Sequence, residues 1–265
     1  MDMMDILGLN EDKIESITIK SGYNKFGEKE NFQEFTIYAG EIISIVGPTG
    51  SGKSRLLGDI EWGAKGDTPT KRVILVNGKE MDDQKRFSPS SKLVAQLSQN
   101  MNFVMDLTVE EFLELHAESR FVENRDEIVE KIFNKANELA GEHFKKDTPI
   151  TSLSGGQSRA LMIADTAILS QSPIVLIDEI ENAGIDRKKA LDLLIGNDKI
   201  VLIVTHDPIL ALMGEKRIVI KNGGINKILD TTDEEKEILK DLVLLDEKFK
   251  KLRDKLRDGQ RVEIC

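Results

Sequence analysis

Residues 41–62 read EIISIVGPTGSGKSRLLGDIEW and carry the strongest structural signal in the chain. Its apolar run at 42–46 predicts a buried strand, and residues 53–62 have the pattern of a helix. Between them lies a match to G-x-x-x-x-G-K-[ST], whose glycines let backbone N–H groups and a helix N-terminus face phosphate groups. The predicted phosphate site consists of Gly47, Pro48, Thr49, Gly50, Ser51, Gly52, Lys53 and Ser54.

Two side chains of this motif have the chemistry to act on a bound triphosphate. We expect Lys53 to reach the β- and γ-phosphates and the Ser54 hydroxyl to ligate Mg²⁺. A second apolar run, 174–177, is followed by the carboxylates Asp178 and Glu179. Ligands bind beyond the carboxyl ends of parallel strands. We therefore expect Asp178 to hold Mg²⁺ through water and Glu179 to polarise the attacking water.

The rest of the chain alternates strands and helices, which predicts an α/β fold with a sheet covered on both faces. Residues 107–146 carry only helical periodicity and predict a helical insertion. The other expected elements are β structure at 14–46, a hairpin at 72–81, a surface loop at 82–92, strands at 92–99, 173–179 and 199–206, and helices from 154 and at 187–196.

The composition excludes several classes of protein. The 265 residues carry a net charge of -10 and only 5% aromatic side chains, so nucleic acid is not an expected partner. One cysteine cannot form an intramolecular disulfide or a cysteine-based zinc module. No apolar run approaches the length of a membrane span, and the acidic start MDMMDILGLNEDK does not resemble a secretory signal. A cytoplasmic location is the expectation, including a peripheral one at the inner face of a membrane.

The segment LSGGQ at 153–157 points to one family when it stands beside the two nucleotide motifs. It resembles the signature motif of ATP-binding cassette (ABC) ATPases, and the resemblance covers residues 14–228. Ile180 departs from the proline that transporter subunits usually carry there, and the segment up to Asp186 is one residue longer than usual. By position, the family's other motifs fall on Gln99 (or Gln96), His206, Phe26 (or Tyr23 as the aromatic residue under adenine), and Ala183, Gly184 and Asp186 of the D-loop.

The resemblance implies a P-loop NTPase core of ABC type, a mixed sheet flanked by helices, and hydrolysis of ATP with Mg²⁺. It gives Mg²⁺ the ligands Ser54, Gln99 and Asp178, and it makes Glu179 and His206 catalytic, with Glu181 the next candidate base. Two cassettes would sandwich ATP, so that Ser154, Gly155, Gly156 and Gln157 of one chain contact the ATP of the other. The second cassette is a copy of this chain or a homologous chain.

Two function classes follow from this family. In the favoured one, the chain is the ATPase subunit of a membrane transporter whose permease subunits are separate proteins. The alternative is a soluble ABC ATPase that remodels or loads a client protein or metallocofactor, which Ile180 favours.

The last part of the chain carries its own pattern. We expect an ABC ATPase domain at 1–232, with a helical subdomain at about 107–150, and an amphipathic helical extension at 233–265. Apolar residues spaced 4, 3, 4, 3 and 4 apart predict a heptad stripe. It would either dock on its own cassette or pair with another chain. The stripe consists of Ile238, Leu242, Leu245, Phe249, Leu252 and Leu256.

Overall fold

The computed structural model describes residues 14–86, 92–97, 103–178 and 184–261. A six-stranded sheet has the order β10-β9-β3-β8-β7-β6, and a four-stranded antiparallel sheet has the order β2-β1-β4-β5. The six-stranded sheet contains β3 (Ile42–Val46), β6 (Val94–Leu97), β7 (Ile174–Asp178), β8 (Ile200–Val204), β9 (Lys216–Lys221) and β10 (Gly224–Asp230). The four-stranded sheet contains β1 (Ser16–Lys20), β2 (Glu34–Tyr38), β4 (Val73–Val76) and β5 (Lys79–Glu80).

Five strands of the larger sheet are parallel, and β10 alone runs antiparallel to its neighbour β9. The sheet is therefore mixed, as expected. Its central strands bury both faces, because side chains alternate across a strand. In β7, Ile174 and Leu176 enter one apolar cluster with β1 and β4, whereas Val175 and Ile177 enter a second cluster with α6 and α7.

Helices lie at the positions that the apolar periodicity predicts and also at 208–213, where the sequence pattern predicts none. They are α2 (Lys53–Glu61), α4 (Val109–Ser119), α5 (Arg125–Leu139), α6 (Gly155–Leu169), α7 (Arg187–Ile195), α8 (Pro208–Met213) and α9 (Asp233–Arg257), with a 3₁₀ turn at Ile150–Ser152. The prediction of a surface loop at 82–92 is wrong for residues 83–86, which form the one-turn helix α3 (Asp83–Arg86). Its first turn is stabilised by the Asp82 carboxylate, which accepts the Gln84 N–H at 2.8 Å.

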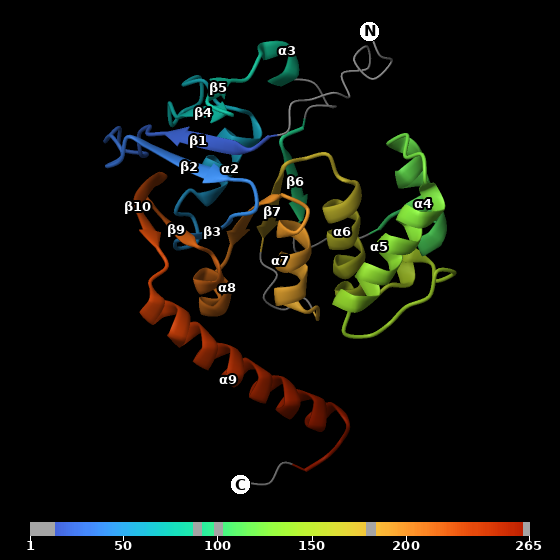
Figure 1. The fold of residues 1–265 in the computed structure, drawn as a ribbon. Coiled ribbons are helices and arrows are strands. Elements are labelled where there is room, and N and C mark those ends of the chain that lie inside the picture. The colour runs from blue at the N-terminus through green and yellow to red at the C-terminus, as the bar shows by residue number, and fades with distance from the viewer. Residues whose placement is uncertain (1–13, 87–91, 98–102, 179–183, 262–265) are drawn as a thin grey trace.

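The hairpin at 72–81 is confirmed. Asn77 (φ 49°) and Gly78 (φ 75°) link β4 to β5 with the positive φ angles that a tight hairpin turn requires. Figure 1 shows this antiparallel sheet above the larger sheet, with α4 and α5 set to one side of it.

Helix α6 joins the helical insertion to the sheet. Ala160 and Ile163 pack with β7 and β8, whereas Leu161 and Ala164 pack with α4 and α5 (Figure 1). Because one helix contributes to both clusters, the insertion and the sheet share a continuous apolar interior. None of the helices in the described part of the chain has the length and apolar character of a membrane-spanning segment.

Helix α9 extends below the sheets and α8 (Figure 1). Its first half touches the body through half-buried residues on one face, Glu235, Leu239, Leu242 and Asp246. Only Leu242 of these belongs to the predicted heptad stripe. The predicted docking of the stripe on its own cassette therefore holds only in part, because a neighbouring face of the same helix makes most of the contact and four of the six stripe residues are exposed.

Candidate nucleotide site

The phosphate-binding loop connects β3 to α2 and packs tightly against the turn between β9 and β10. A Cβ atom at Gly52 (φ 102°) would lie 2.5 Å from the Gly223 Cα, and one at Gly47 would lie 2.5 Å from the Ile220 carbonyl oxygen. The Gly223 N–H also donates to the Ser51 carbonyl oxygen at 2.6 Å. Only glycine fits at positions 47 and 52. The contacts with Ile220 and Gly223, which are distant in sequence, therefore help to fix the curvature of the loop.

The charge on this loop comes from Lys53 and from the N-terminus of α2. The Lys53 ammonium donates to the carbonyl oxygens of Gly47 at 2.9 Å and Pro48 at 3.4 Å, so it lies over the concave side of the loop. No acidic residue occupies the first turn of α2. A cationic side chain, a helix N-terminus and a close backbone turn together fit a phosphate group.

One buried hydroxyl lies inside this loop. The Ser51 Oγ has no hydrogen-bond partner among the described residues, and Ser51 is buried. A buried polar atom without a partner costs free energy unless a ligand or water supplies one. The orphaned hydroxyl supports a polar ligand in the cradle.

The carboxyl ends of three parallel strands meet beside the loop. Ile45 of β3 pairs with Val204 of β8, and Val204 pairs with Asp178 of β7. Asp178 is half-buried at the last position of its strand. Neighbouring strands lie about 4.8 Å apart, so Asp178 stands about 10 Å across the sheet edge from the loop, within reach of a bound triphosphate.

His206 lies on an exposed turn that its neighbours hold in place. The buried Thr205 hydroxyl accepts the Asp207 N–H at 2.9 Å, and the Asp207 carboxylate caps α8 by accepting the N–H groups of Ile209 and Leu210. Arg187 donates to the other oxygen of Asp207 at 3.1 Å. His206 therefore lies at the same sheet edge as Asp178, on a turn held by the hydrogen bonds of Asp207.

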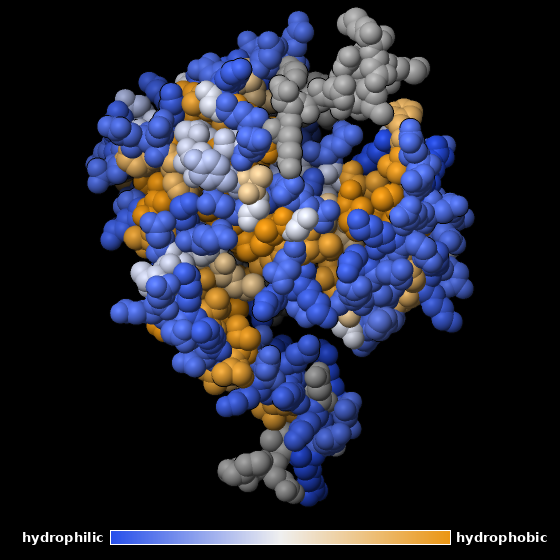
Figure 2. Space-filling model, in the orientation of Figure 1, coloured by the Kyte–Doolittle hydropathy of each residue, from blue (hydrophilic) through white to orange (hydrophobic). Residues whose placement is uncertain are grey.

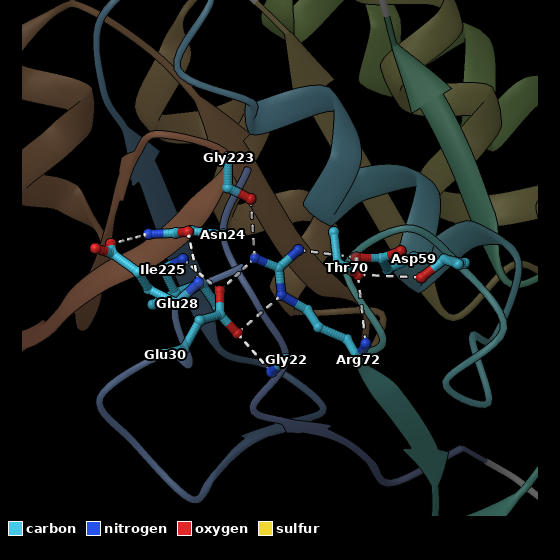
Figure 3. A network of polar contacts seen from close by, with 10 residues as sticks. Gly22, Asn24, Glu28, Glu30, Asp59, Thr70, Arg72, Gly223 and Ile225 are labelled. Atoms are coloured by element: carbon cyan, nitrogen blue, oxygen red, sulfur yellow. Dashed lines mark hydrogen bonds and ion pairs between the residues drawn. The ribbon is translucent and has the colours of Figure 1, made fainter. Parts of the chain in front are cut away.

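A buried ion network supports the other side of the loop (Figure 3). The fully buried guanidinium of Arg72 pairs with Glu30 and with Asp59, the latter at 2.8 Å, and it donates to the Gly223 carbonyl oxygen at 3.4 Å. Burial lowers the pKa of Arg72, but the hydrogen bonds and charges of the two carboxylates outweigh it and leave that pKa above its usual value. The network ties α2 and the antiparallel sheet to the turn on which the loop rests.

Sequence reasoning missed this network. Glu30, Asp59 and Arg72 are separated along the chain and form no recognisable spacing. Arg72 directly precedes an apolar strand, and Asp59 lies in an amphipathic helix, where a charged residue is ordinary. Only the tertiary contact reveals that all three are buried together.

The aromatic candidates lie near the loop but differ in position. Phe26 is 67% exposed on a turn in which the Lys25 N–H donates to the Asn222 carbonyl oxygen at 2.8 Å. Asn222 precedes Gly223, which touches the phosphate-binding loop. The alternative, Tyr23, donates its N–H to Thr70 at 2.7 Å and lies under the Lys71 ammonium. Phe26 is thus the aromatic residue that the β9–β10 turn links to the loop.

The signature segment forms the N-terminus of α6, as predicted. The Ser154 hydroxyl accepts the Gln157 N–H, and the Gln157 side chain accepts the Ser154 N–H at 2.9 Å, which makes a capping box. The Gln157 amide also donates to the carbonyl oxygens of Glu142 and His143. Gly155 and Gly156 form the first turn, so its N–H groups are not shielded by side chains.

The structure brings the signature segment beside Gly184, the first described residue of the predicted D-loop. A Cβ atom at Gly184 would contact the Gly156 Cα at 3.6 Å, and the Gly184 carbonyl oxygen accepts the Gly141 N–H at 3.2 Å. Asp186 caps α7. The end of the predicted D-loop therefore lies between the C-terminal end of α5 and the N-terminus of α6.

Several predicted site residues lie outside the described residues: Gln99, Glu179, Glu181 and Ala183. Their roles stay predictions. The rival Gln96 is exposed on β6, opposite Leu176 of β7. Among the described residues, no group of three or more His, Cys, Asp or Glu side chains could hold a metal ion.

Comparison with known proteins gives a consistent result. The family model described as "ABC transporter" matches residues 31–182. An ABC transporter ATP-binding protein of Methanocaldococcus jannaschii is 56% identical over 250 residues, which cover 94% of this chain and 95% of that protein.

Solved structures have the same architecture. The cbiO1 subunit of a Clostridium perfringens ABC transporter complex has a TM-score of 0.62 at 21% identity, over 91% of this chain and all of that chain. A second M. jannaschii ATP-binding cassette, solved as a post-hydrolysis dimer with ADP and phosphate, has a TM-score of 0.55 at 25% identity, over 82% of this chain and 99% of that one.

Proposed function

This chain belongs to the ABC transporter family as an ATP-binding and ATP-hydrolysing subunit, and we propose that two cassettes close around ATP to drive a membrane permease. The single observation that carries the proposal is the cradle at Gly47–Ser54, where Lys53 and two obligatory glycines form a phosphate site beside Asp178. The second cassette is a further copy of this chain or a homologous chain. The dimeric M. jannaschii structure with ADP and phosphate supports this arrangement.

Within each site we assign the triphosphate to the loop and adenine to Phe26. Lys53 would exchange its bonds to Gly47 and Pro48 for the β- and γ-phosphates. Ser54, Asp178 and Gln99 are the side chains that would hold Mg²⁺, which supplies charge neutralisation to the phosphates. The exposed ring of Phe26 is available for stacking, and its turn is fixed to the loop through Asn222.

Hydrolysis needs a carboxylate that positions water against the γ-phosphorus. We assign this role to Glu179, because it follows Asp178 directly at the edge of the sheet. Water would form the new P–O bond while the bond between the γ-phosphorus and the bridging oxygen breaks and ADP leaves. His206 would orient that carboxylate from the end of the neighbouring strand.

Ser154, Gly155, Gly156 and Gln157 would complete the site of the partner cassette. The N-terminus of α6 is favourable for a γ-phosphate. Ala183, Gly184 and Asp186 would lie in the same interface, because Gly184 contacts Gly156. We place the working protein in the cytoplasm, at the inner face of the membrane against its permease.

The test is a hydrolysis-deficient variant examined by size-exclusion chromatography with light scattering. Glu179→Gln should bind ATP, lose ATPase activity and accumulate as a dimer with ATP and Mg²⁺. Glu181→Gln, a matched change two residues away, should hydrolyse normally. If Glu179→Gln hydrolyses ATP at the wild-type rate, the assignment of the base fails.

A complementation experiment tests the shared site. Lys53→Ala and Ser154→Arg should each be inactive, and mixing them should restore part of the activity, because one site of the mixed dimer is intact. A mixture that is as inactive as its components at saturating protein concentration contradicts the sandwich.

A further inference from the structure

Helix α9 carries an apolar stripe that its own chain covers only in part, since Leu242 and Leu252 are half-buried. Four members of the heptad pattern are strongly exposed: Ile238 at 52%, Leu245 at 49%, Phe249 at 61% and Leu256 at 58%. The half-buried face of α9, with Leu239 and Asp246, lies beside this stripe and meets the body near α8. Figure 2 shows apolar side chains gathered where the start of α9 meets the body.

The charges of α9 are divided between its two halves. Residues 233–247 contain seven acidic and two basic residues, whereas residues 248–257 contain one acidic and six basic residues. A helix dipole favours this order of charges, but only within the first and last turns. It does not explain Asp241 or Lys248, which lie near the middle of the helix. A surface that is acidic at one end and basic at the other is complementary to an antiparallel copy of itself.

From this stripe and this charge pattern we propose that α9 is a homodimerisation helix, which pairs antiparallel with α9 of a second copy. In an antiparallel pair, positions that flank the apolar seam on the same side face each other. With Asp241 opposite Lys248 of the second copy, Glu234 comes opposite Lys255, and twofold symmetry repeats both pairs. Leu242 then packs on Leu245 and Ile238 packs on Phe249, whereas Leu252 falls beside Glu235 and Leu256 lies past the start of the second helix.

The four flanking residues are available for this contact. Glu234, Asp241, Lys248 and Lys255 are exposed, and none of them makes an ion pair with another described residue of its own chain. The acidic residues on the half-buried face are occupied instead, since Glu235 pairs with Arg217 and Asp246 pairs with Arg187. The second copy would therefore approach the side of α9 that faces away from the body.

A parallel pair is disfavoured by the same residues. It would place Asp241 beside Asp246 of the second copy and Lys248 beside Arg253. Like charges at these positions repel. The antiparallel pair also requires no nucleotide, so its test is separate from that of the ATP-bound dimer.

Sedimentation equilibrium of the full chain without nucleotide tests the proposal. The wild type should dimerise in the micromolar range, and Lys53→Ala, placed in the ATP site, should dimerise equally. Asp241→Lys should weaken the dimer about tenfold at low salt. The double variant Asp241→Lys, Lys248→Asp should restore it, because the exchanged charges again face each other. The matched control Glu247→Lys reverses a charge opposite the seam and should leave the association unchanged.

Each alternative gives a different result. Tighter association of Asp241→Lys would indicate a parallel pair and overturn the antiparallel one. A wild-type protein that stays monomeric at 100 μM overturns the pairing. So does a monomer that co-sediments with phosphatidylglycerol vesicles only when α9 is present, since the stripe would then bind a membrane.

Direction can be measured directly with spin labels at Arg257→Cys in a Cys265→Ser background. Two labels should lie about 40 Å apart in the antiparallel pair, at a rise of about 1.5 Å per residue. A distance of about 10 Å, the spacing of adjacent helices, would overturn the antiparallel arrangement.

Discussion

Arg187 and Asp246, 59 residues apart in the chain, form an ion pair with an N–O distance of 2.5 Å. Arg187 follows the D-loop at the start of α7, and its second nitrogen binds Asp207, which caps α8 directly after His206. A single guanidinium thus joins the C-terminal helix, the D-loop end and the turn that carries His206.

This junction gives the first prediction. Asp246→Asn removes the pair with Arg187 and a longer pair with Arg253 at 3.9 Å, whereas Arg187→Ala removes the pairs with Asp246 and Asp207. A double-mutant cycle of the two substitutions should give a coupling energy of about 0.5–1 kcal/mol from denaturant unfolding, because both side chains are partly exposed. Hydrogen exchange of the α9 amides should become faster in both variants. If the free-energy changes of the two single substitutions add up to that of the double variant within error, the Arg187–Asp246 contact contributes little to holding α9.

The second prediction concerns the buried network. Arg72→Met leaves the carboxylates of Glu30 and Asp59 buried without a counterion, and should cost about 3–5 kcal/mol of the free energy of unfolding. The control Arg125→Met removes an exposed pair with Glu118 and should cost at most about 1 kcal/mol. Thermal unfolding of both variants measures the difference, and equal shifts would contradict a structural role for the network.

The third prediction compares two glycines on either side of the start of α2. Gly52→Ala puts a methyl group 2.5 Å from the Gly223 Cα at a φ of 102°, so the loop must deform and ATP affinity should fall at least tenfold. Gly58→Ala meets nothing within 4 Å inside the helix and should stabilise the protein by up to about 1 kcal/mol. Fluorescent nucleotide titration and thermal unfolding check the two outcomes. Wild-type affinity in Gly52→Ala would show that the close approach to Gly223 is unimportant.

The fourth prediction is a pH dependence at the start of α9. The hydrogen bond from Arg217 lowers the pKa of Glu235, with help from the Thr232 N–H. A carboxyl whose pKa is lower in the folded state stabilises the protein above its unfolded pKa of about 4.5, and this contribution is lost as the pH falls through the folded value. Glu235→Gln should therefore lower the Tm at pH 7, and the difference from wild type should shrink below pH 4.5. A constant difference down to pH 3 would exclude ionisation as the cause.

The order of the elements and the chemistry of the loop follow from local sequence patterns. Strands at 42–46, 174–178 and 200–204 are continuous apolar runs that suit only a sheet buried on both faces, and the glycine pattern before Lys53 allows one kind of turn. The capping box of Ser154 and Gln157 is equally local, because all of its bonds lie within one helical turn.

The tertiary structure decided what depends on contacts between distant residues. The curvature of the phosphate-binding loop depends on its contact with Gly223, and the buried network depends on Arg72 reaching Glu30 and Asp59. The position of Phe26 depends on the hydrogen bond from the Lys25 N–H to Asn222. The sequence contains the apolar stripe of α9, but it does not show which face of the helix the body covers. The ion pairs of Glu235 and Asp246 fix that choice, because they turn a neighbouring face of the helix toward Arg217 and Arg187 and leave four of the six stripe residues exposed.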